Sequence, residues 1–343
     1  MEKTTGNYNG LDLGKFIMAI LVVSIHTHPL ADCANRLLYA IWANLSPMAV
    51  PFFFVTTSWL FFNREDDIYS EKCREDLRKR ICHFGFLYIL WEILYLPCIL
   101  TGYYRAGGSL AFNTVDYIRK FILVGSNYYS SQFWFLLAMV YMLIVLLLFL
   151  KWRLSLNKIF IISCLFYGIG TIINHLIEIR PDGASGILWL LVRYFSSLCN
   201  ESIVLARFIY IALGMIMAKR HTVLTKGKIA LFFVIGVLGR TIVPGWYLLE
   251  SVALLLEVIA VFQLFMQLDL GSHPIYKKLR ESSMVLYYTH FYFIFLYELV
   301  FHDFSQSGWK LFGICLLCCL LFSALVIRLK QNHSFRWLKT MFG

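Results

Sequence analysis

Ten apolar stretches recur along the chain, and their length constrains the fold more than any other feature of the sequence. A bilayer core is about 30 Å thick, so a helix that rises about 1.5 Å per residue crosses it in about 20 residues. Only 15% of the residues are charged and the mean hydropathy is +0.69, whereas about a quarter of the residues are charged in soluble domains. We therefore predict an all-α, polytopic integral membrane protein with about ten transmembrane helices in one domain, 1–343. The predicted spans are 11–29, 40–62, 81–100, 131–150, 158–178, 202–218, 228–243, 246–268, 283–301 and 308–328.

Lysine and arginine are concentrated in alternate loops, which predicts the orientation in the membrane. Cytoplasmic loops carry the excess of these residues, and here the even-numbered connections and the C-terminal tail are the basic ones. We therefore expect both termini in the cytoplasm. We expect no cleavable signal peptide, because the first ten residues are polar and the first apolar run contains charges. The basic loops explain the net charge of +11, so nucleic acid is not an expected partner.

The nine cysteines show no metal-ligand spacing, and most of them lie within apolar spans. We therefore expect small core residues there, and neither a disulfide framework nor a metal site. No internal repeat with a period of roughly 20–50 residues is visible, which agrees with a single domain.

The first span, LDLGKFIMAILVVSIHTHPL, carries ionisable residues that make it the strongest candidate site. Such side chains cost free energy in a membrane unless they are paired or face a polar interior. Lys15 and His26 are eleven residues apart, close to three helical turns, so they share one face about 16 Å apart. Asp12 precedes Lys15 by three residues, where an ion pair can form, and His28 points elsewhere. The alternative is that Asp12 and Lys15 are interfacial anchors and His26 is a packed histidine.

The second connection ends in the basic sequence LRKRICHF, where the third span begins. Arg78, Lys79, Arg80 and His83 can anchor the helix on the cytoplasmic side, which is the more common role of such residues. They can also bind the phosphates of an anionic ligand, because arginine offers forked donors to phosphate. The residues alone leave both interpretations open.

Polar and aromatic residues in later spans form a further set of candidates. Trp134 lies in the aromatic start of the fourth span, and His290 lies in the ninth, SSMVLYYTHFYFIFLYEL. Both residues can bind substrate. Alternatively, Trp134 lies in the aromatic belt at the membrane interface and His290 is a packed core residue. Carboxyl groups within spans need partners, and the sequence offers Lys15, Arg207 and Arg240 without deciding between them. These carboxyl groups belong to Glu92, Glu250 and Glu257.

The ordered set of these motifs resembles the acyltransferase-3 family of bacterial membrane O-acyltransferases. It comprises the lysine and histidine of the first span, PFFFVTTSWLFF in the second, the basic start of the third, FWFL in the fourth and SSMVLYYTH in the ninth. Arg80 and His83 fall on the family's Arg-x-x-Arg, so histidine replaces the second arginine, and Ser58 replaces the glycine of the family's Ser-Gly-aromatic turn. The sequence is also similar to the membrane domain of vancomycin-resistance serine racemases, which carry a soluble racemase after the last helix.

The resemblance implies an acyl-CoA-dependent O-acyltransferase in the bacterial cytoplasmic membrane. The acyl group, usually acetyl, would move from cytoplasmic acetyl-CoA to a hydroxyl group of an envelope glycan or another extracytoplasmic acceptor. Two alternatives stay open: a transporter or membrane module for a small polar solute such as serine, partnering a soluble enzyme, and a scaffold that positions a partner enzyme. Besides membrane lipid, a second copy of the chain is compatible with the sequence. The implied roles are catalysis for His26, Lys15 and Asp12, CoA binding for Arg78, Lys79, Arg80 and His83, and acceptor binding for Trp134 and His290.

Overall fold

The structure, a computed structural model, describes residues 8–179, 186–199, 203–242 and 245–342. Every regular element within these residues is helical, which confirms the predicted all-α membrane fold. The shorter elements are 3-10 turns at Ser46–Met48, Ser131–Phe133 and His333–Phe335 and a π-helical turn at Lys120–Val124. In chain order the helices are α1 (Asn9–Thr27), α2 (Arg36–Leu45), α3 (Ala49–Phe62), α4 (Glu71–Ala106), α5 (Leu110–Arg119), α6 (Trp134–Lys151), α7 (Leu156–Glu178), α8 (Ile187–Cys199), α9 (Ile203–Lys219), α10 (Lys226–Ile242), α11 (Tyr247–Gln267), α12 (Pro274–Phe301), α13 (Trp309–Leu329) and α14 (Trp337–Phe342).

The ten predicted spans lie on these helices except for a few residues at their ends and a turn within the second span, while residues 202 and 243 lie outside the described residues. Among the described residues, eight helical segments are long and apolar enough to cross a bilayer. The remaining two predicted spans are α9 and α10, each of 17 residues, which cover about 26 Å at the usual helical rise. The total of ten spans and the cytoplasmic position of both termini therefore stay predictions.

The second predicted span, 40–62, is divided between two helices. α2 ends at Leu45, a 3-10 turn covers Ser46–Met48, and α3 begins at Ala49. Pro47 lies in this turn, where a residue without an N–H group costs no helical hydrogen bond.

The chain folds into two compact units, each built from separate stretches of sequence. The first unit combines Met1–Thr56, Val223–Val243 and Val252–Gly343. The second unit combines Thr57–Thr222 and Pro244–Ser251. The first unit therefore holds the first and ninth predicted spans, and the second unit holds the third and fourth.

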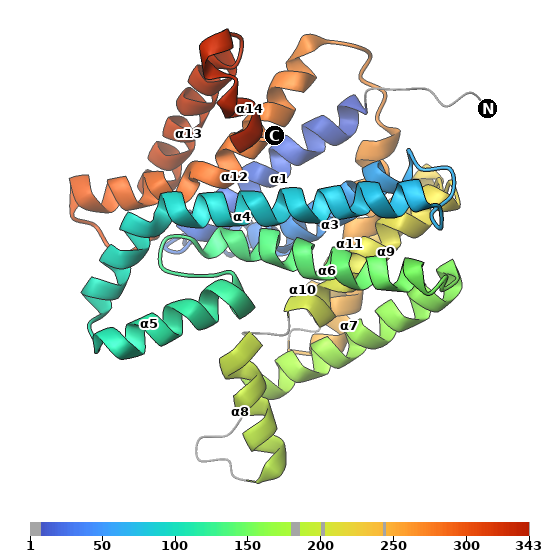
Figure 1. The fold of residues 1–343 in the computed structure, drawn as a ribbon, viewed down its shortest axis with the longest axis horizontal. Coiled ribbons are helices and arrows are strands. Elements are labelled where there is room, and N and C mark those ends of the chain that lie inside the picture. The colour runs from blue at the N-terminus through green and yellow to red at the C-terminus, as the bar shows by residue number, and fades with distance from the viewer. Residues whose placement is uncertain (1–7, 180–185, 200–202, 243–244, 343) are drawn as a thin grey trace. The chain divides into compact units, whose positions relative to one another are not determined.

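In the first unit, α1 packs along α12, which in turn packs against α13 (Figure 1). Gly14 lets α1 come close to its neighbours, because a Cβ atom there would lie 2.8 Å from Phe52 Cζ and 2.9 Å from Phe265 Cγ. The short helix α14 folds back onto α12, with the ring of Phe342 6.1 Å from that of Tyr288. Backbone approach at a glycine thus brings the ionisable first span against the rest of its unit.

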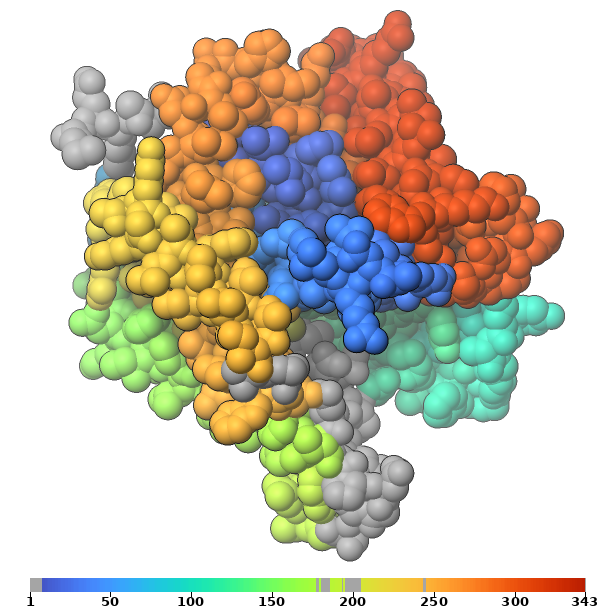
Figure 2. Space-filling model, turned by 180° about the vertical axis from the view of Figure 1, so that it is seen from behind, coloured from blue at the N-terminus to red at the C-terminus, as the bar shows by residue number. Residues whose placement is uncertain are grey.

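A buried ion pair joins α10, α11 and α2 within the same unit. Arg240 Nη1 donates to Glu257 Oε2 at 2.9 Å, and the Glu257 side chain is fully buried. The same guanidinium donates to the carbonyl oxygens of Ala43 and Asn44 at the end of α2. Figure 2 shows α2, in mid-blue, lying on the surface beside the yellow α10. Of the partners that the sequence offered for Glu257, Arg240 is the one that binds it.

In the second unit, α4 packs along α6 and α7 packs along α9. Two side-chain hydrogen bonds tie distant parts of this unit together: Ser58 Oγ donates to the carbonyl of Ile211 at 2.6 Å, and Tyr69 Oη donates to that of Leu154 at 2.7 Å. Ser58, which stands at the family's glycine position, therefore holds α3 against α9.

Candidate functional site

The site begins with a cluster of charges where α1 and α12 start. Asp12 Oδ2 lies 3.2 Å from Arg280 Nη1, and Asp12 Oδ1 lies 3.8 Å from Lys15 Nζ. The Asp12 side chain is only 8% exposed, and burying a carboxylate requires such partners. The predicted pair of Asp12 and Lys15 is present, and Arg280 adds a second cation.

Two histidines meet near the far end of the same pair of helices. The rings of His26 and His290 lie 5.3 Å apart between centroids, inclined by 26°. Phe291 contacts both rings, at 4.7 Å and 4.9 Å. Because α1 and α12 touch at Asp12 and Arg280 near one end and at the histidines near the other, the two helices run parallel.

Hydrogen bonding fixes the proton on His290. Its Nδ1 lies 2.9 Å from the carbonyl oxygen of Leu286, which can only accept, so Nδ1 carries the hydrogen. Nε2 of the neutral ring is then an acceptor, and it has no hydrogen-bond partner among the described residues although His290 is fully buried. His26 is half-buried beside it. An unsatisfied buried acceptor next to a second imidazole is suited to bind or deprotonate a hydroxyl group.

The end of α1 next to the histidines is covered by polar contacts. Trp42 Nε1 donates to Ser24 Oγ at 2.9 Å, and its ring meets the edge of His28 at 6.1 Å. Gly308 N donates to the carbonyl of Thr27 at 3.0 Å. His28 itself is exposed and ends the helix with a left-handed backbone, at φ 39°. His28 thus lies beyond Thr27, the last residue of α1, and its orientation away from His26 stays a prediction.

Arg280 is the residue that sequence reasoning missed. It precedes His290 by ten residues on α12, close to the eleven that separate Lys15 from His26 on α1. This repeated spacing of a cation and a histidine was a usable signal. The sequence does not show that α1 pairs with α12. This pairing brings Lys15 and His26 beside Arg280 and His290.

The predicted basic residues of α4, in the second unit, differ in the partners that they contact. Arg78 pairs with Glu71 at 3.4 Å and Lys79 pairs with Asp76 at 2.8 Å, both on the exposed face of α4. Arg80 forms no ion pair among the described residues and lies 5.2 Å above the ring of Phe61. Exposed His83 follows one turn later on the same helix. The positive charge of Arg64 and the negative charges of Asp76 and Glu65 all act on Arg80.

Trp134 is the first residue of α6 and is half-buried. Near it, a buried polar group lies between α4 and the loop that precedes α6. Ser130 Oγ donates to Glu92 Oε1 at 3.1 Å, whereas Glu92 Oε2 has no hydrogen-bond partner among the described residues. Trp134 and His290 belong to different units, and their joint role in acceptor binding stays a prediction.

The third connection carries a network around a single carboxylate. Asp116 receives hydrogen bonds or ion pairs from Tyr103 at 2.9 Å, Arg119 at 2.8 Å and Lys120 at 2.7 Å. Burial by itself raises the pKa of Asp116, but these three donors outweigh it and lower the pKa to about 2. Lys120 also lies above the rings of Tyr103 and Tyr128. The tyrosine-rich stretch is thus an ordered surface, held by α5 and the turn that follows it.

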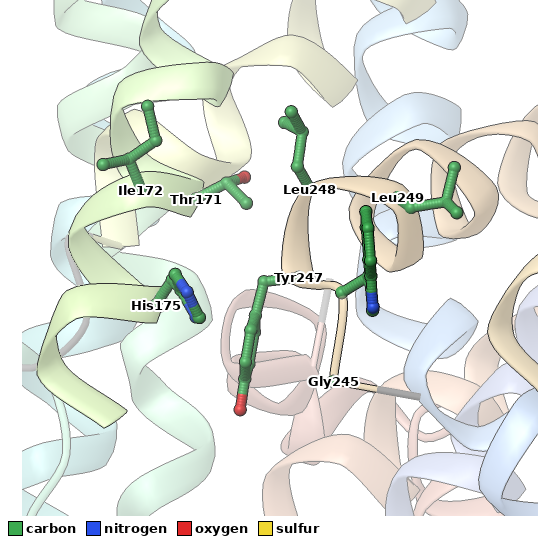
Figure 3. A pocket seen from close by; sticks show the side chains of 8 residues that line it. Thr171, Ile172, His175, Gly245, Tyr247, Leu248 and Leu249 are labelled. Atoms are coloured by element: carbon green, nitrogen blue, oxygen red, sulfur yellow. The ribbon is translucent and has the colours of Figure 1, made fainter. Parts of the chain in front are cut away.

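An apolar pocket of about 320 Å³ lies elsewhere in the second unit, between α7 and the start of α11. Figure 3 shows His175 and Tyr247 facing one another across it, with ring centroids 4.7 Å apart. No residue predicted from the sequence for catalysis or binding is among those that line it. The lining residues are Thr171, Ile172, His175, Gly245, Trp246, Tyr247, Leu248 and Leu249.

Comparisons with known proteins agree with this arrangement of motifs. A family described as an acyltransferase domain matches residues 8–328. Two curated proteins of Enterococcus faecalis, both named amino-acid racemase, are 30% identical over 125 residues and 27% identical over 165 residues. These matches cover 36% and 48% of this chain but only 17% and 21% of the relatives, so the chain spans a small part of their length. No solved structure matches.

Proposed function

Because the match covers residues 8–328, the chain belongs to the acyltransferase-3 family of membrane acyltransferases, and we propose that it moves an acyl group from cytoplasmic acyl-CoA to an extracytoplasmic hydroxyl group. Acetyl is the first acyl group to test, and a glycan of the bacterial envelope is the first acceptor. The observation that carries the proposal is the parallel pairing of α1 and α12, with cations at one level and two histidines at the other.

The two neighbouring histidines suit the chemistry of acyl transfer. The acceptor oxygen attacks the carbonyl carbon of the thioester while its proton passes to an imidazole nitrogen of His26. The carbon–sulfur bond then breaks, and the CoA thiolate takes up that proton and leaves as a free thiol. A positioned histidine contributes roughly 10²–10⁴-fold in such steps.

His290 supports this step from the neighbouring helix. Its Nδ1 hydrogen is held by the carbonyl of Leu286, so Nε2 can accept a hydrogen bond from the acceptor molecule. His290 thereby orients the acceptor molecule through a second hydroxyl group, because the single hydrogen of the attacking hydroxyl passes to His26. Asp12 holds Lys15 at the level where the phosphates of the donor would arrive.

The basic residues of α4 are proposed to bind CoA phosphates. The carboxylates that pair with Arg78 and Lys79 lie on an exposed surface, where such pairs contribute only about 0–1 kcal/mol. A phosphate can therefore displace them. Arg80 needs no displacement, because among the described residues it forms no ion pair. We expect Arg80→Gln to raise the KM for acyl-CoA more than Arg78→Gln does.

The test is release of free thiol from acetyl-CoA by the purified protein in lipid nanodiscs supplied with an envelope extract. Thiol release that requires the extract, together with new acetyl esters on envelope glycans by mass spectrometry, supports the proposal. Absence of thiol release with every acyl-CoA and extract tried, from a protein shown to be folded, contradicts it.

The two racemase relatives favour a second candidate function. In this alternative the chain is a membrane module that admits a small polar solute such as serine and delivers it to a soluble partner enzyme. Uptake of labelled serine into proteoliposomes without any acyl-CoA would support it. The two candidates are distinguished in one preparation, because transport consumes no thioester and acyl transfer moves no serine.

A further inference from the structure

We infer that Arg280 binds a phosphate group of the acyl donor at the start of the α1–α12 pair, acting together with Lys15. This inference rests on the proposed function and adds a donor-binding residue to it. Arg280 lies outside the motifs that suggested the donor site, and the ion pair with Asp12 is what brings it to Lys15.

Two cations, Lys15 and Arg280, flank the single carboxylate of Asp12 at 3.8 Å and 3.2 Å. The carboxylate is nearly buried, whereas 44% of the Arg280 side chain is exposed. The only ion pair described for Arg280 uses its Nη1, so other donors of the planar guanidinium remain on the exposed side. A guanidinium held by a carboxylate on one edge is preorganised to bind phosphate on another.

The distance to the histidines matches the shape of the donor. Arg280 precedes His290 by ten residues, or about 15 Å of helix, and Lys15 precedes His26 by eleven, or about 16 Å. An acyl-CoA carries its phosphates and its thioester at opposite ends of the extended pantetheine arm. Phosphates at the level of Arg280 would therefore place the thioester near the histidines. A hydroxyl acceptor that lacks phosphate has no group that Lys15 and Arg280 would bind.

Membrane anchoring does not account for the position of Arg280. Lys277 and Lys278, on the preceding turn of α12, are exposed as anchors are. Arg280 instead reaches across to a buried carboxylate on another helix. Lys278 therefore provides a matched control, since it lies on the same helix, is two residues away and carries the same charge.

The experiment measures CoA binding and transfer kinetics for the full chain in nanodiscs. We expect Arg280→Gln to weaken CoA binding in calorimetry about 10- to 100-fold and to raise the KM for acetyl-CoA by a similar factor. The kcat of Arg280→Gln should stay within about twofold of the wild-type value. For Lys278→Gln, CoA binding, KM and kcat should all stay within about twofold of wild type. Acetyl-pantetheine, which lacks all the phosphates of CoA, should have the same KM with the wild-type protein as with Arg280→Gln.

Two further variants separate donor binding from structural support. Arg280→Lys keeps the charge but loses the forked donors, so its KM should lie between those of wild type and Arg280→Gln. Asp12→Asn combined with Arg280→Gln removes the ion pair from both sides. If Arg280 only neutralises Asp12, this double variant recovers CoA binding, which overturns the inference, whereas continued weak binding supports it.

The outcomes also separate this inference from the proposed function. If the wild-type protein binds no CoA, the proposed function fails and the inference fails with it. If the wild type binds CoA and Arg280→Gln binds it equally well, only the inference fails, as when Arg280 contacts a lipid headgroup phosphate instead. Equal loss of kcat with acetyl-CoA and acetyl-pantetheine, together with a lower Tm, assigns Arg280 a structural role and likewise overturns the inference.

Discussion

The rings of His26 and His290 stack with their centroids 5.3 Å apart, although the two residues are 264 positions apart in the chain. Within the part of the chain that the structure describes, a backbone carbonyl fixes the tautomer of His290 but not that of His26. The pair thus combines a held acceptor with a half-buried imidazole, and the two can be tested separately.

Replacement of His26 should abolish most of the transfer activity. We expect His26→Ala to lower kcat by about 10²–10⁴-fold, because it removes the proposed base. Thiol release from acetyl-CoA in nanodiscs measures this, with size-exclusion profiles to show that the protein is folded. The control is His28→Asn, since His28 is exposed and asparagine tolerates its left-handed backbone. Full activity of a folded His26→Ala protein would refute the assignment.

Replacement of His290 by asparagine should affect the acceptor more than the fold. The asparagine amide can still donate to the Leu286 carbonyl, but it has no equivalent of the Nε2 acceptor. We expect the KM for the acceptor to rise about tenfold, which corresponds to the loss of one hydrogen bond of about 1.4 kcal/mol. Tm should change little. An unchanged KM with a large fall in Tm would instead indicate that His290 is only a core residue.

Breaking the Arg240–Glu257 pair should destabilise the first unit. Arg240→Ala leaves a fully buried carboxylate unpaired and two α2 carbonyls without their donor. Loss of one partner from a buried pair costs about 3–5 kcal/mol, so we expect a clear drop in Tm in detergent. Adding Glu257→Gln to Arg240→Ala should recover part of this loss. If the double variant is less stable than the single one, the carboxylate is not the source of the cost.

An alanine at Gly14 should be destabilising, in contrast to an alanine at Gly85. The Cβ at Gly14 would press into Phe52 and Phe265, and overpacking of this kind costs about 1–3 kcal/mol. A Cβ at Gly85, in α4, meets nothing within 4 Å, so alanine there should stabilise the helix by up to about 1 kcal/mol. Thermal unfolding of the two variants checks the opposite signs. A Gly14→Ala protein as stable as wild type would contradict the close approach of α1.

The network of Asp116 should give the third connection a dependence on acid pH. The pKa of Asp116 is lowered from 3.8 to about 2, so its carboxylate stabilises the folded form above pH 4. This contribution is lost as the pH falls from about 4 to about 2. We expect Asp116→Asn to make the connection more sensitive to protease at neutral pH. In thermal unfolding, the difference from wild type should narrow below pH 4, and a constant difference down to pH 2 would contradict this role.

Several parts of the site follow from local sequence. The span lengths required a membrane fold, and the spacings in the first span placed Lys15 and His26 on one face and Asp12 against Lys15. These relations hold because they lie within one helix, whose geometry is fixed by its own backbone. The family resemblance implies Arg80 and His83 as one motif, and the structure places them one turn apart on α4. Which acidic residues pair with Arg78 and Lys79 was not evident from the sequence.

The sequence by itself determined the membrane class, the helices and the residues that share a face, because these depend on hydropathy and helical period. Only the tertiary structure decided that α1 pairs with α12, that Arg280 joins Asp12, and that Arg240 rather than Lys15 or Arg207 pairs with Glu257. Such pairings join residues far apart in the chain, and any exposed face of an apolar helix could in principle meet any other. Packing at residues such as Gly14 selects one arrangement, and the need to pair buried charges then brings the chemistry together.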